Sequence, residues 1–282
     1  MTDSKVVVIG ASGFIGQSLC LSFEASGLEV ERYSRSVANG DCYLDLEDPR
    51  SFSKLCRVKD QVVVFLAAKT NLAKCQQYPE MAQKVNVDNT KLLIDILQKQ
   101  NNFIIFASTN LVFGSKEASF PLDACYAPED AYSRGKVQIE EYLSSNLPSR
   151  SAIVRLSKVL SKETPLIKNW IEQLKTKQTL TPFLDHYLAP VWLADVVELF
   201  KTIALQRCTG VFHLSGAEDV SYASFVEGLA DLMEASSPRI EPVSAYGRIA
   251  SPVRYASLMN VWPEDFKANV DMKSVIEHIL AE

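Results

Sequence analysis

Residues 6–16 read Val-Val-Val-Ile-Gly10-Ala-Ser-Gly13-Phe-Ile-Gly16, an apolar run followed by three glycines at three-residue spacing. The apolar run predicts a β-strand, and Ile15–Ala25 has the periodicity of a helix. Glycines between a strand and a helix permit a tight turn, close approach of the backbone to a pyrophosphate, and close packing of helix on strand. The helix N-terminus adds free N–H groups and a partial positive charge. We therefore expect a dinucleotide-binding turn formed by Gly10, Ser12, Gly13, Phe14, Ile15 and Gly16; the alternative is a glycine-rich turn without a ligand.

Strands and helices alternate on the C-terminal side of this turn. Short apolar runs predict further strands at Glu29–Tyr33, Gln61–Leu66, Phe103–Phe106 and Ala152–Leu156. Helical periodicity separates them, at Pro49–Cys56, Pro79–Lys99 and Asp130–Ser144. This alternation is typical of a parallel sheet with helices on both faces. We expect an α/β fold, a Rossmann-type doubly wound parallel sheet.

The second half of the chain is less regular. It predicts helices at Glu163–Lys177, Ala194–Leu205, Ser224–Met233 and Met272–Leu280, and a strand at Gly210–Leu214. No linker separates the halves. We expect an NAD(P)-binding Rossmann domain over residues 1–157, completed by segments near 190–215, and a smaller C-terminal lobe, mainly 158–282, that binds substrate.

Composition excludes several classes of protein. With 47% hydrophobic and 22% charged residues in 282, the chain is globular, and a net charge of −5 argues against a general nucleic-acid binder. Apolar runs are strand-sized, so no membrane span is expected. The first residues lack a basic start and a long apolar stretch, which predicts no secretory signal and a cytoplasmic location. No Cys-x-x-Cys pair and no histidine spacing indicates a metal site.

The end of the second predicted strand bears on the choice of cofactor. In dinucleotide folds an acidic residue at this place binds the ribose 2′-hydroxyl of NAD. Here Ser34 and Arg35 stand instead. A hydroxyl and a guanidinium can bind a 2′-phosphate that a carboxylate would repel. We expect NADP(H) to be preferred over NAD(H); the alternative is that Arg35 is a solvated loop residue.

Tyr132 and Lys136 are four residues apart and share one face of a predicted helix. A free tyrosine has a pKa of about 10, and a nearby ammonium group could lower that pKa by about one unit or more. Thr109, at the end of the preceding strand, can hydrogen-bond a substrate oxygen. The alternatives are a core-packed tyrosine on the helix face and local capping by Ser108 and Thr109.

Together with further segments, these motifs resemble a known family over nearly the whole chain. The segments are Ala67-Ala-Lys-Thr-Asn-Leu-Ala-Lys74, Pro79-Glu-Met-Ala82, Val85-Asn86-Val87, Ser108-Thr-Asn-Leu-Val-Phe-Gly114, Leu188-Ala-Pro-Val191 with Asp195, Gly210-Val-Phe-His-Leu214, and Arg254 near Ser257-Leu258. The chain resembles the extended short-chain dehydrogenase/reductases of the NAD-dependent epimerase/dehydratase superfamily, and within them the dTDP-4-dehydrorhamnose reductase branch.

The resemblance implies hydride transfer between NADPH and a keto group on a nucleotide-activated sugar. Thr109 would orient the carbonyl, Tyr132 would donate the proton, and Lys136 would tune Tyr132 and bind the cofactor ribose. Asp45 and Leu46 would border the adenine, and Ala67, Ala68 and Asn86 would line the nicotinamide half of the site. Lys69 is a further candidate cofactor-binding residue. The candidate substrate-binding residues are Thr70, Asn110, Arg155 and Arg254, of which Arg155 could equally be a structural ion-pair residue.

Some positions differ from the reductases of this branch. Asn110-Leu111 stands where they carry Asp-Tyr, Ala73 and Gln76 replace acidic residues, and Ser133 replaces a glycine. Two alternatives stay open: an epimerase or dehydratase on the same scaffold, which Asn110 and Ser34-Arg35 disfavour, and a non-catalytic NADP-binding regulatory subunit. The expected partners are a small-molecule nucleotide sugar and, as a homodimer, a second copy of the chain.

Overall fold

The computed structural model describes residues 5–37, 41–235, 238–249 and 252–282. Its centre is a seven-stranded sheet in the order β11-β6-β5-β4-β1-β2-β3, in which every neighbouring pair is parallel. The predicted α/β Rossmann-type fold is confirmed. The strands of this sheet are β1 (Lys5–Ile9), β2 (Glu29–Ser34), β3 (Cys42–Tyr43), β4 (Val62–Phe65), β5 (Phe103–Thr109), β6 (Ser151–Leu156) and β11 (Gly210–Leu214).

The middle strands are apolar on both faces because helices cover both sides of the sheet. Val7, Val63 and Ile104 are aligned in register across β1, β4 and β5, and all three are fully buried. From β1 the chain proceeds to β2 and β3 on one side, and through β4, β5 and β6 on the other. The carboxyl ends of β1 and β4 therefore form the topological switch point, where open α/β sheets bind ligands.

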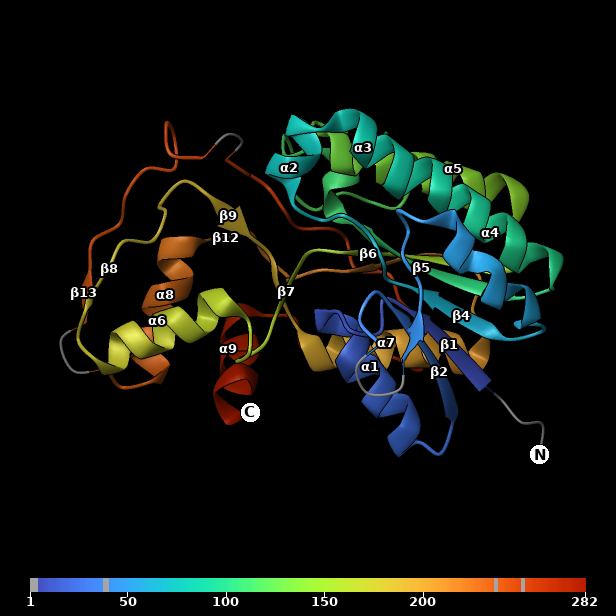
Figure 1. Ribbon diagram of the computed structural model, residues 1–282. Helices are drawn as coiled ribbons and strands as arrows, with labels where there is room; N and C mark the ends of the chain where they lie inside the picture. Colours follow the sequence, from blue (N-terminus) through green and yellow to red (C-terminus); the bar gives the residue numbers. More distant parts are fainter. Residues whose placement is uncertain (1–4, 38–40, 236–237, 250–251) are drawn as a thin grey trace.

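Two helical layers enclose the sheet (Figure 1). In the first, α1 (Phe14–Ala25) packs beside α7 (Leu193–Gln206), and their buried side chains share one apolar core with the sheet. The second layer buries a separate core against the opposite face. It contains α2 (Leu72–Gln77), α3 (Pro79–Gln83), α4 (Asn89–Lys99) and α5 (Ala131–Asn146).

The helix predicted at Pro79–Lys99 contains an irregularity. Between α3 and α4 a π-helical turn occupies Lys84–Asp88, while the backbone at Lys84 stays in the helical region at φ −58°. A single π turn widens a helix without ending it and often occurs at functional sites. Asn86 lies in this turn. A single π turn changes the apolar spacing of the sequence very little, so the sequence did not predict this turn. A 3₁₀ helix, Pro49–Arg57, stands where a short helix was expected.

The remaining elements form a lobe at one end of the sheet, at the left in Figure 1. Its helices pack on one another around a third apolar core. They are α6 (Pro165–Lys175), α8 (Tyr222–Leu232) and α9 (Met272–Ala281). Three short strand pairs complete the lobe: β7 (Lys158–Leu160) with β10 (Pro190–Trp192), β8 (Thr179–Leu180) with β13 (Arg239–Ile240), and β9 (Tyr187–Leu188) with β12 (Val220–Ser221). The domain boundary at residue 157 stays a prediction.

Across the described ranges, no helix is both long and apolar enough to span a membrane.

Candidate functional site

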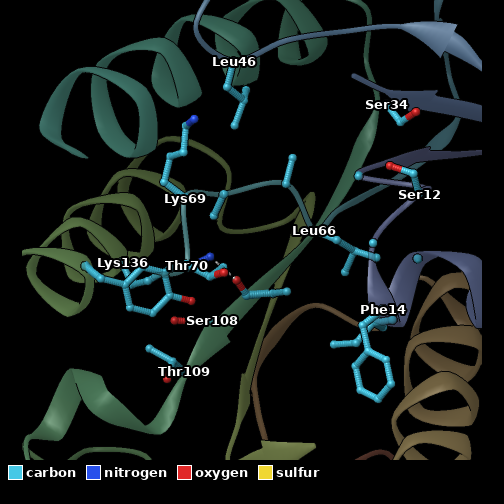
Figure 2. A pocket seen from close by; sticks show the side chains of 18 of the residues that line it. Ser12, Phe14, Ser34, Leu46, Leu66, Lys69, Thr70, Ser108, Thr109 and Lys136 are labelled. Carbon is cyan, nitrogen blue, oxygen red and sulfur yellow. Dashed lines mark hydrogen bonds between the residues drawn. The ribbon is translucent and has the colours of Figure 1, made fainter. Parts of the chain in front are cut away.

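A cleft of about 440 Å³ opens at the switch point of the sheet. This volume is within the range of small-molecule sites. The glycine turn lies at one end, and Ser108, Thr109 and Lys136 gather at the other (Figure 2). The expected site residues that line it are Gly10, Ser12, Gly13, Phe14, Ile15, Gly16, Ser34, Arg35, Asp45, Leu46, Ala67, Ala68, Lys69, Thr70, Thr109, Tyr132 and Lys136.

Sequence reasoning missed part of the lining. Three of these residues, Leu44, Leu66 and Val85, are next in sequence to the expected site residues Asp45, Ala67 and Asn86, and this proximity was the available signal. Ala107 lies on β5, two residues before Thr109. Three further lining residues lie where the chain passes from β6 into β7: Leu156, Ser157 and Val159. Nothing in the local sequence indicates that this connection is part of a site.

The glycine turn has the geometry that a bound pyrophosphate requires. Gly10 has a φ of +95°, and a Cβ atom there would lie 2.9 Å from the backbone nitrogen of Ala67. A Cβ atom on Gly16 would lie 2.2 Å from the carbonyl oxygen of Gly10, so the helix packs directly on the turn. Gly13 is the N-cap of α1 and offers no side-chain cap, and the first turn carries no acidic residue. The N–H groups of that turn suit an anion. The residues present therefore fit a dinucleotide cofactor.

An acidic residue that was not predicted as part of the site, Asp41, lies beside Ser34 at the end of β2. The Ser34 side chain is 3% exposed, and its hydroxyl oxygen lies 2.8 Å from Oδ2 of Asp41. Ser34 also hydrogen-bonds the carbonyl oxygen of Ser36, while Arg35 is exposed. Asp41 therefore lies beside Ser34, although the two are seven residues apart in the sequence. Arg35 favours a 2′-phosphate at this end of the cleft, and Asp41 opposes one.

Tyr132 is placed by the way α5 begins. Asp130 is the N-cap, and its carboxylate accepts a 2.9 Å hydrogen bond from the backbone N–H of Ser133. The Ser133 hydroxyl is within 3.3 Å of the Asp130 backbone nitrogen, which completes a capping box. This cap fixes the first turn, so Tyr132 and Lys136 project into the cleft one turn apart. Ser133 is thus a capping residue.

Lys136 is buried, 5% exposed, at the floor of the cleft. Its ammonium group donates a 2.6 Å hydrogen bond to the carbonyl oxygen of Ala107 and lies 4.3 Å from the centroid of the Phe106 ring. Burial lowers the pKa of Lys136 to about 8, and the nearby Glu140 carboxylate opposes that shift. Lys136 is therefore charged at neutral pH but loses its proton far more easily than an exposed lysine.

The expected lowering of the Tyr132 pKa is wrong. Burial raises the pKa of Tyr132 above its usual value near 10, and the negative charge of Asp130 adds to the effect. The Lys136 ammonium nitrogen lies 5.7 Å from the centroid of the Tyr132 ring and directs its hydrogen bond to Ala107. Desolvation therefore outweighs the lysine. Tyr132 keeps its proton throughout the neutral range.

Two hydroxyl groups at the end of β5, those of Ser108 and Thr109, both form hydrogen bonds within the protein. Thr109 donates to Oδ1 of Asn110 at 3.2 Å and accepts from the N–H of Leu111 at 3.3 Å. Ser108 donates to Oε1 of Glu140, a buried carboxylate on α5. The proton of Ser108 is committed to Glu140, whereas the hydrogen bond of Thr109 is long and easily exchanged.

Asn86 supports the cleft from behind and is not part of its lining. Its side-chain oxygen accepts from the Lys69 N–H at 2.8 Å, and its amide nitrogen donates to the Lys69 carbonyl at 2.9 Å. Both backbone groups of Lys69 are thereby fixed from the π turn. The Lys69 side chain forms an ion pair with Glu47, on the loop after Leu46. Asn86 thus shapes the loop over the cleft.

Arg155 lies outside the cleft, in a buried ion pair. Arg155 is 3% exposed and Glu140 is fully buried. Two guanidinium nitrogens donate to Oε2 of Glu140, at 2.9 and 2.7 Å, and Arg155 also bonds the Tyr126 hydroxyl and the His213 ring. The assignment of Arg155 to substrate is therefore corrected in favour of the structural alternative, because its hydrogen-bonding groups are already used.

Arg254 and Asn110 also lie outside the cleft lining. Arg254 is exposed, and its Nε donates to the Tyr246 hydroxyl at 3.2 Å. The Asn110 side chain bonds protein atoms at both ends. No cluster of three potential metal-ligating side chains occurs among the residues that the structure describes.

Comparison of the sequence with known proteins identifies a family, and comparison with solved structures shows the fold. The model of a family described as the RmlD substrate binding domain matches residues 4–272. The dTDP-4-dehydrorhamnose reductase of Salmonella typhimurium is 24% identical, over 95% of this chain and 92% of that protein. Methionine adenosyltransferase 2 subunit beta of Xenopus tropicalis is 22% identical, over 85% of this chain and 75% of that protein.

Among solved structures, the dTDP-4-dehydrorhamnose reductase of Bacillus anthracis in complex with NADP superposes with a TM-score of 0.86 at 17% identity, covering all of this chain and 99% of that one. At this identity the superposition shows the shared fold. The family match extends over nearly the whole chain. The chain therefore belongs to the RmlD substrate binding domain family, within the NAD(P)-dependent epimerase/dehydratase superfamily of extended short-chain dehydrogenase/reductases.

Proposed function

We propose that this protein reduces a keto group on a nucleotide-activated sugar with NADPH. The observation that carries the proposal is that Thr109 and Lys136 lie at one end of a cleft whose other end is the glycine turn (Figure 2). Tyr132, one helical turn from Lys136 on α5, lines the same cleft. The name of the Salmonella typhimurium relative, dTDP-4-dehydrorhamnose reductase, supports the same chemistry.

The cleft divides into regions with distinct tasks. The glycine turn would hold the pyrophosphate, Asp45 and Leu46 would border the adenine, and Ala67 and Ala68 would line the nicotinamide half. A bound NADPH supplies the hydride. The protein's own contribution is to bind the keto oxygen and deliver a proton to it.

Thr109 binds the keto oxygen with its hydroxyl, and Tyr132 donates the proton. The raised pKa of Tyr132 keeps the phenol protonated at neutral pH, so it enters the reaction as an acid. The charge of Lys136 stabilises the phenolate that remains after the proton has left. Lys136 also binds the cofactor ribose in this proposal.

The pH dependence of activity follows from Lys136. Its pKa is lowered to about 8 by burial, and its charged form is present below that pH. We expect kcat/KM to fall as the pH rises through about 8, because the phenolate of Tyr132 then loses its stabilising charge. Initial rates from pH 6 to 10 test this. A flat profile across pH 8 would show that the charge of Lys136 is not required.

Cofactor preference tests the adenosine end of the cleft. We propose that NADPH binds more tightly than NADH because Arg35 can pair with a 2′-phosphate. One charge-assisted hydrogen bond contributes roughly 1.5–3 kcal/mol, about tenfold or more in affinity. Arg35→Ala should weaken NADPH binding and change NADH binding little. Asp41→Asn should strengthen NADPH binding, because it removes the charge beside Ser34.

Titration calorimetry of both cofactors with each variant measures these changes. Asp48→Asn is the matched control, because that carboxylate pairs with the exposed Arg50, outside the cleft lining. Equal affinity of the wild type for the two cofactors would mean that Arg35 is a solvated loop residue.

The substrate, assembly and location stay predictions. We propose that the sugar nucleotide lies between Thr109 and the C-terminal lobe, with Thr70 on the cleft and Arg254 as a candidate for its phosphates. Arg254 is exposed on the segment that follows the lobe's short strands. A homodimer and a cytoplasmic location are further predictions.

Two other functions remain to be compared with the reductase. An epimerase or dehydratase would interconvert or dehydrate sugars without net oxidation of NADPH. The similarity to methionine adenosyltransferase 2 subunit beta favours, as a second candidate, an NADP-binding subunit of another enzyme. NADPH oxidation with a panel of keto-sugar nucleotides distinguishes the three. Turnover supports the reductase, and tight NADP binding without turnover supports the subunit.

A further inference from the structure

Asn110 connects the proposed substrate-binding hydroxyl to a distant segment of the chain. Its amide nitrogen donates a 2.8 Å hydrogen bond to the carbonyl oxygen of Ala256, 146 residues away. Its side-chain oxygen accepts from the Thr109 hydroxyl at 3.2 Å. A carbonyl oxygen can only accept, so Ala256 fixes which end of the amide faces which neighbour. The oxygen of Asn110 must face Thr109.

The Ala256 carbonyl is itself held firmly. Asp219 accepts hydrogen bonds from the N–H groups of Ala256 and Ser257, at 2.5 and 2.8 Å, and from the Ser257 hydroxyl at 2.7 Å. The N–H of Ser119 donates to the same hydroxyl at 3.0 Å. Ala256 and Ser257 are buried. Asn110 is thereby attached to an anchor built from two further segments of the chain.

We propose that Asn110 is a positioning residue, which holds the Thr109 hydroxyl in the orientation that receives the keto oxygen. The proposal rests on the role of Thr109 proposed above. In the free enzyme the Thr109 proton points to Asn110 through a long hydrogen bond. When a keto oxygen arrives, Thr109 donates to it instead, and Asn110 stays in place because Ala256 holds it.

In this chain the role requires an amide, because the side chain at position 110 must donate to the Ala256 carbonyl oxygen and accept from Thr109. An aspartate here would present two acceptor oxygens, so one would face the Ala256 carbonyl without a proton between them. The other would hold the Thr109 proton through a charge-assisted hydrogen bond, roughly twice as strong as a neutral one. Both effects would oppose the transfer of that hydrogen bond to the substrate.

The experiment uses Asn110→Asp in the full-length protein, with NADPH and the keto-sugar nucleotide that the wild type turns over. At pH 8 we expect kcat/KM to be lower than wild type by roughly 10- to 100-fold, the usual effect of an unsatisfied buried polar group. As the pH falls toward 5, the ratio of variant to wild type should rise. A protonated carboxyl can donate to Ala256 while accepting from Thr109, as the amide does.

The charged groups around this position favour protonation within that range. Asp219 binds the Ala256 and Ser257 N–H groups, and Tyr132, neutral at these pH values, shares the cleft with Thr109. A carboxyl that faces a carbonyl oxygen near a second carboxylate has a raised pKa. The control is Asn169→Asp, an exposed position on α6, whose ratio to wild type should stay constant with pH.

A double-mutant cycle distinguishes positioning from a structural role. If Asn110 acts through Thr109, Asn110→Asp should cost little further activity in a Thr109→Ala background. Additive losses, or wild-type kcat/KM in Asn110→Asp at pH 8, or no recovery at low pH, would overturn the proposal. The wild-type assay comes first: absence of turnover there contradicts the proposed function itself, whereas these outcomes contradict only the role of Asn110.

Discussion

Replacing Tyr132 with phenylalanine is expected to lower turnover by roughly 10²- to 10⁴-fold, the usual contribution of general acid catalysis. The ring, half-buried at the start of α5, would be retained, so the fold and NADPH binding should be preserved. Only the hydroxyl that donates the proton is removed. Single-turnover kinetics with NADPH and a keto-sugar nucleotide, together with calorimetric NADPH binding, measure both quantities.

Tyr142→Phe is the matched control, because this tyrosine lies on the same helix, outside the cleft lining, with its hydroxyl bonded to Asp95. Its turnover should stay near that of the wild type. Lys136→Met should lower turnover and also weaken NADPH binding, since it removes the proposed ribose contact. An active Tyr132→Phe enzyme would contradict the proposed proton donor.

The second large effect concerns stability. Arg155→Met would leave the Glu140 carboxylate buried without its cation, and removal of one partner of a buried ion pair costs about 3–5 kcal/mol. The bonds of Arg155 to Tyr126 on a loop and His213 on β11 would be lost together with the pair on α5. Urea unfolding measures the change in the free energy of unfolding.

The control for that experiment is Lys273→Met, which breaks the exposed pair with Glu277 and should cost at most about 1 kcal/mol. The double variant Glu140→Leu, Arg155→Met removes both charges and should be less destabilised than Arg155→Met alone, because no unpaired charge is left buried. If Arg155→Met were as stable as the surface control, the buried pair of Arg155 and Glu140 would not contribute to the free energy of unfolding.

The architecture could be predicted because its signals are local. Continuous apolar runs mark β1, β4 and β5 as strands buried on both faces, and glycine spacing marks the first turn. The pairing of the short strands in the C-terminal lobe was not predicted. Two residues such as those of β9 carry no periodicity, and their pairing with β12 depends on contacts between distant segments.

In the site, too, features set by neighbouring residues could be predicted, whereas features set by contacts between distant segments could not. The glycine turn and the Tyr132–Lys136 pair line the cleft as expected, because turn geometry and helical spacing are properties of neighbouring residues. Asp41 was missed because its position beside Ser34 follows from the folded chain and from no local pattern in the sequence. Arg155 could be assigned to the buried pair only once α5 and β6 were packed together. The Tyr132 pKa was misjudged because burial, which dominates it, cannot be read from spacing.

The proposed reaction is the transfer of a hydride from NADPH to a keto sugar. It is tested most directly with NADPH that carries deuterium at the transferable position, mixed with a 4-keto nucleotide sugar. Mass spectrometry of the product should find one deuterium per sugar, with one NADPH oxidised for each product formed. Interconversion of sugars with no net loss of NADPH and no deuterium in the product would contradict the account.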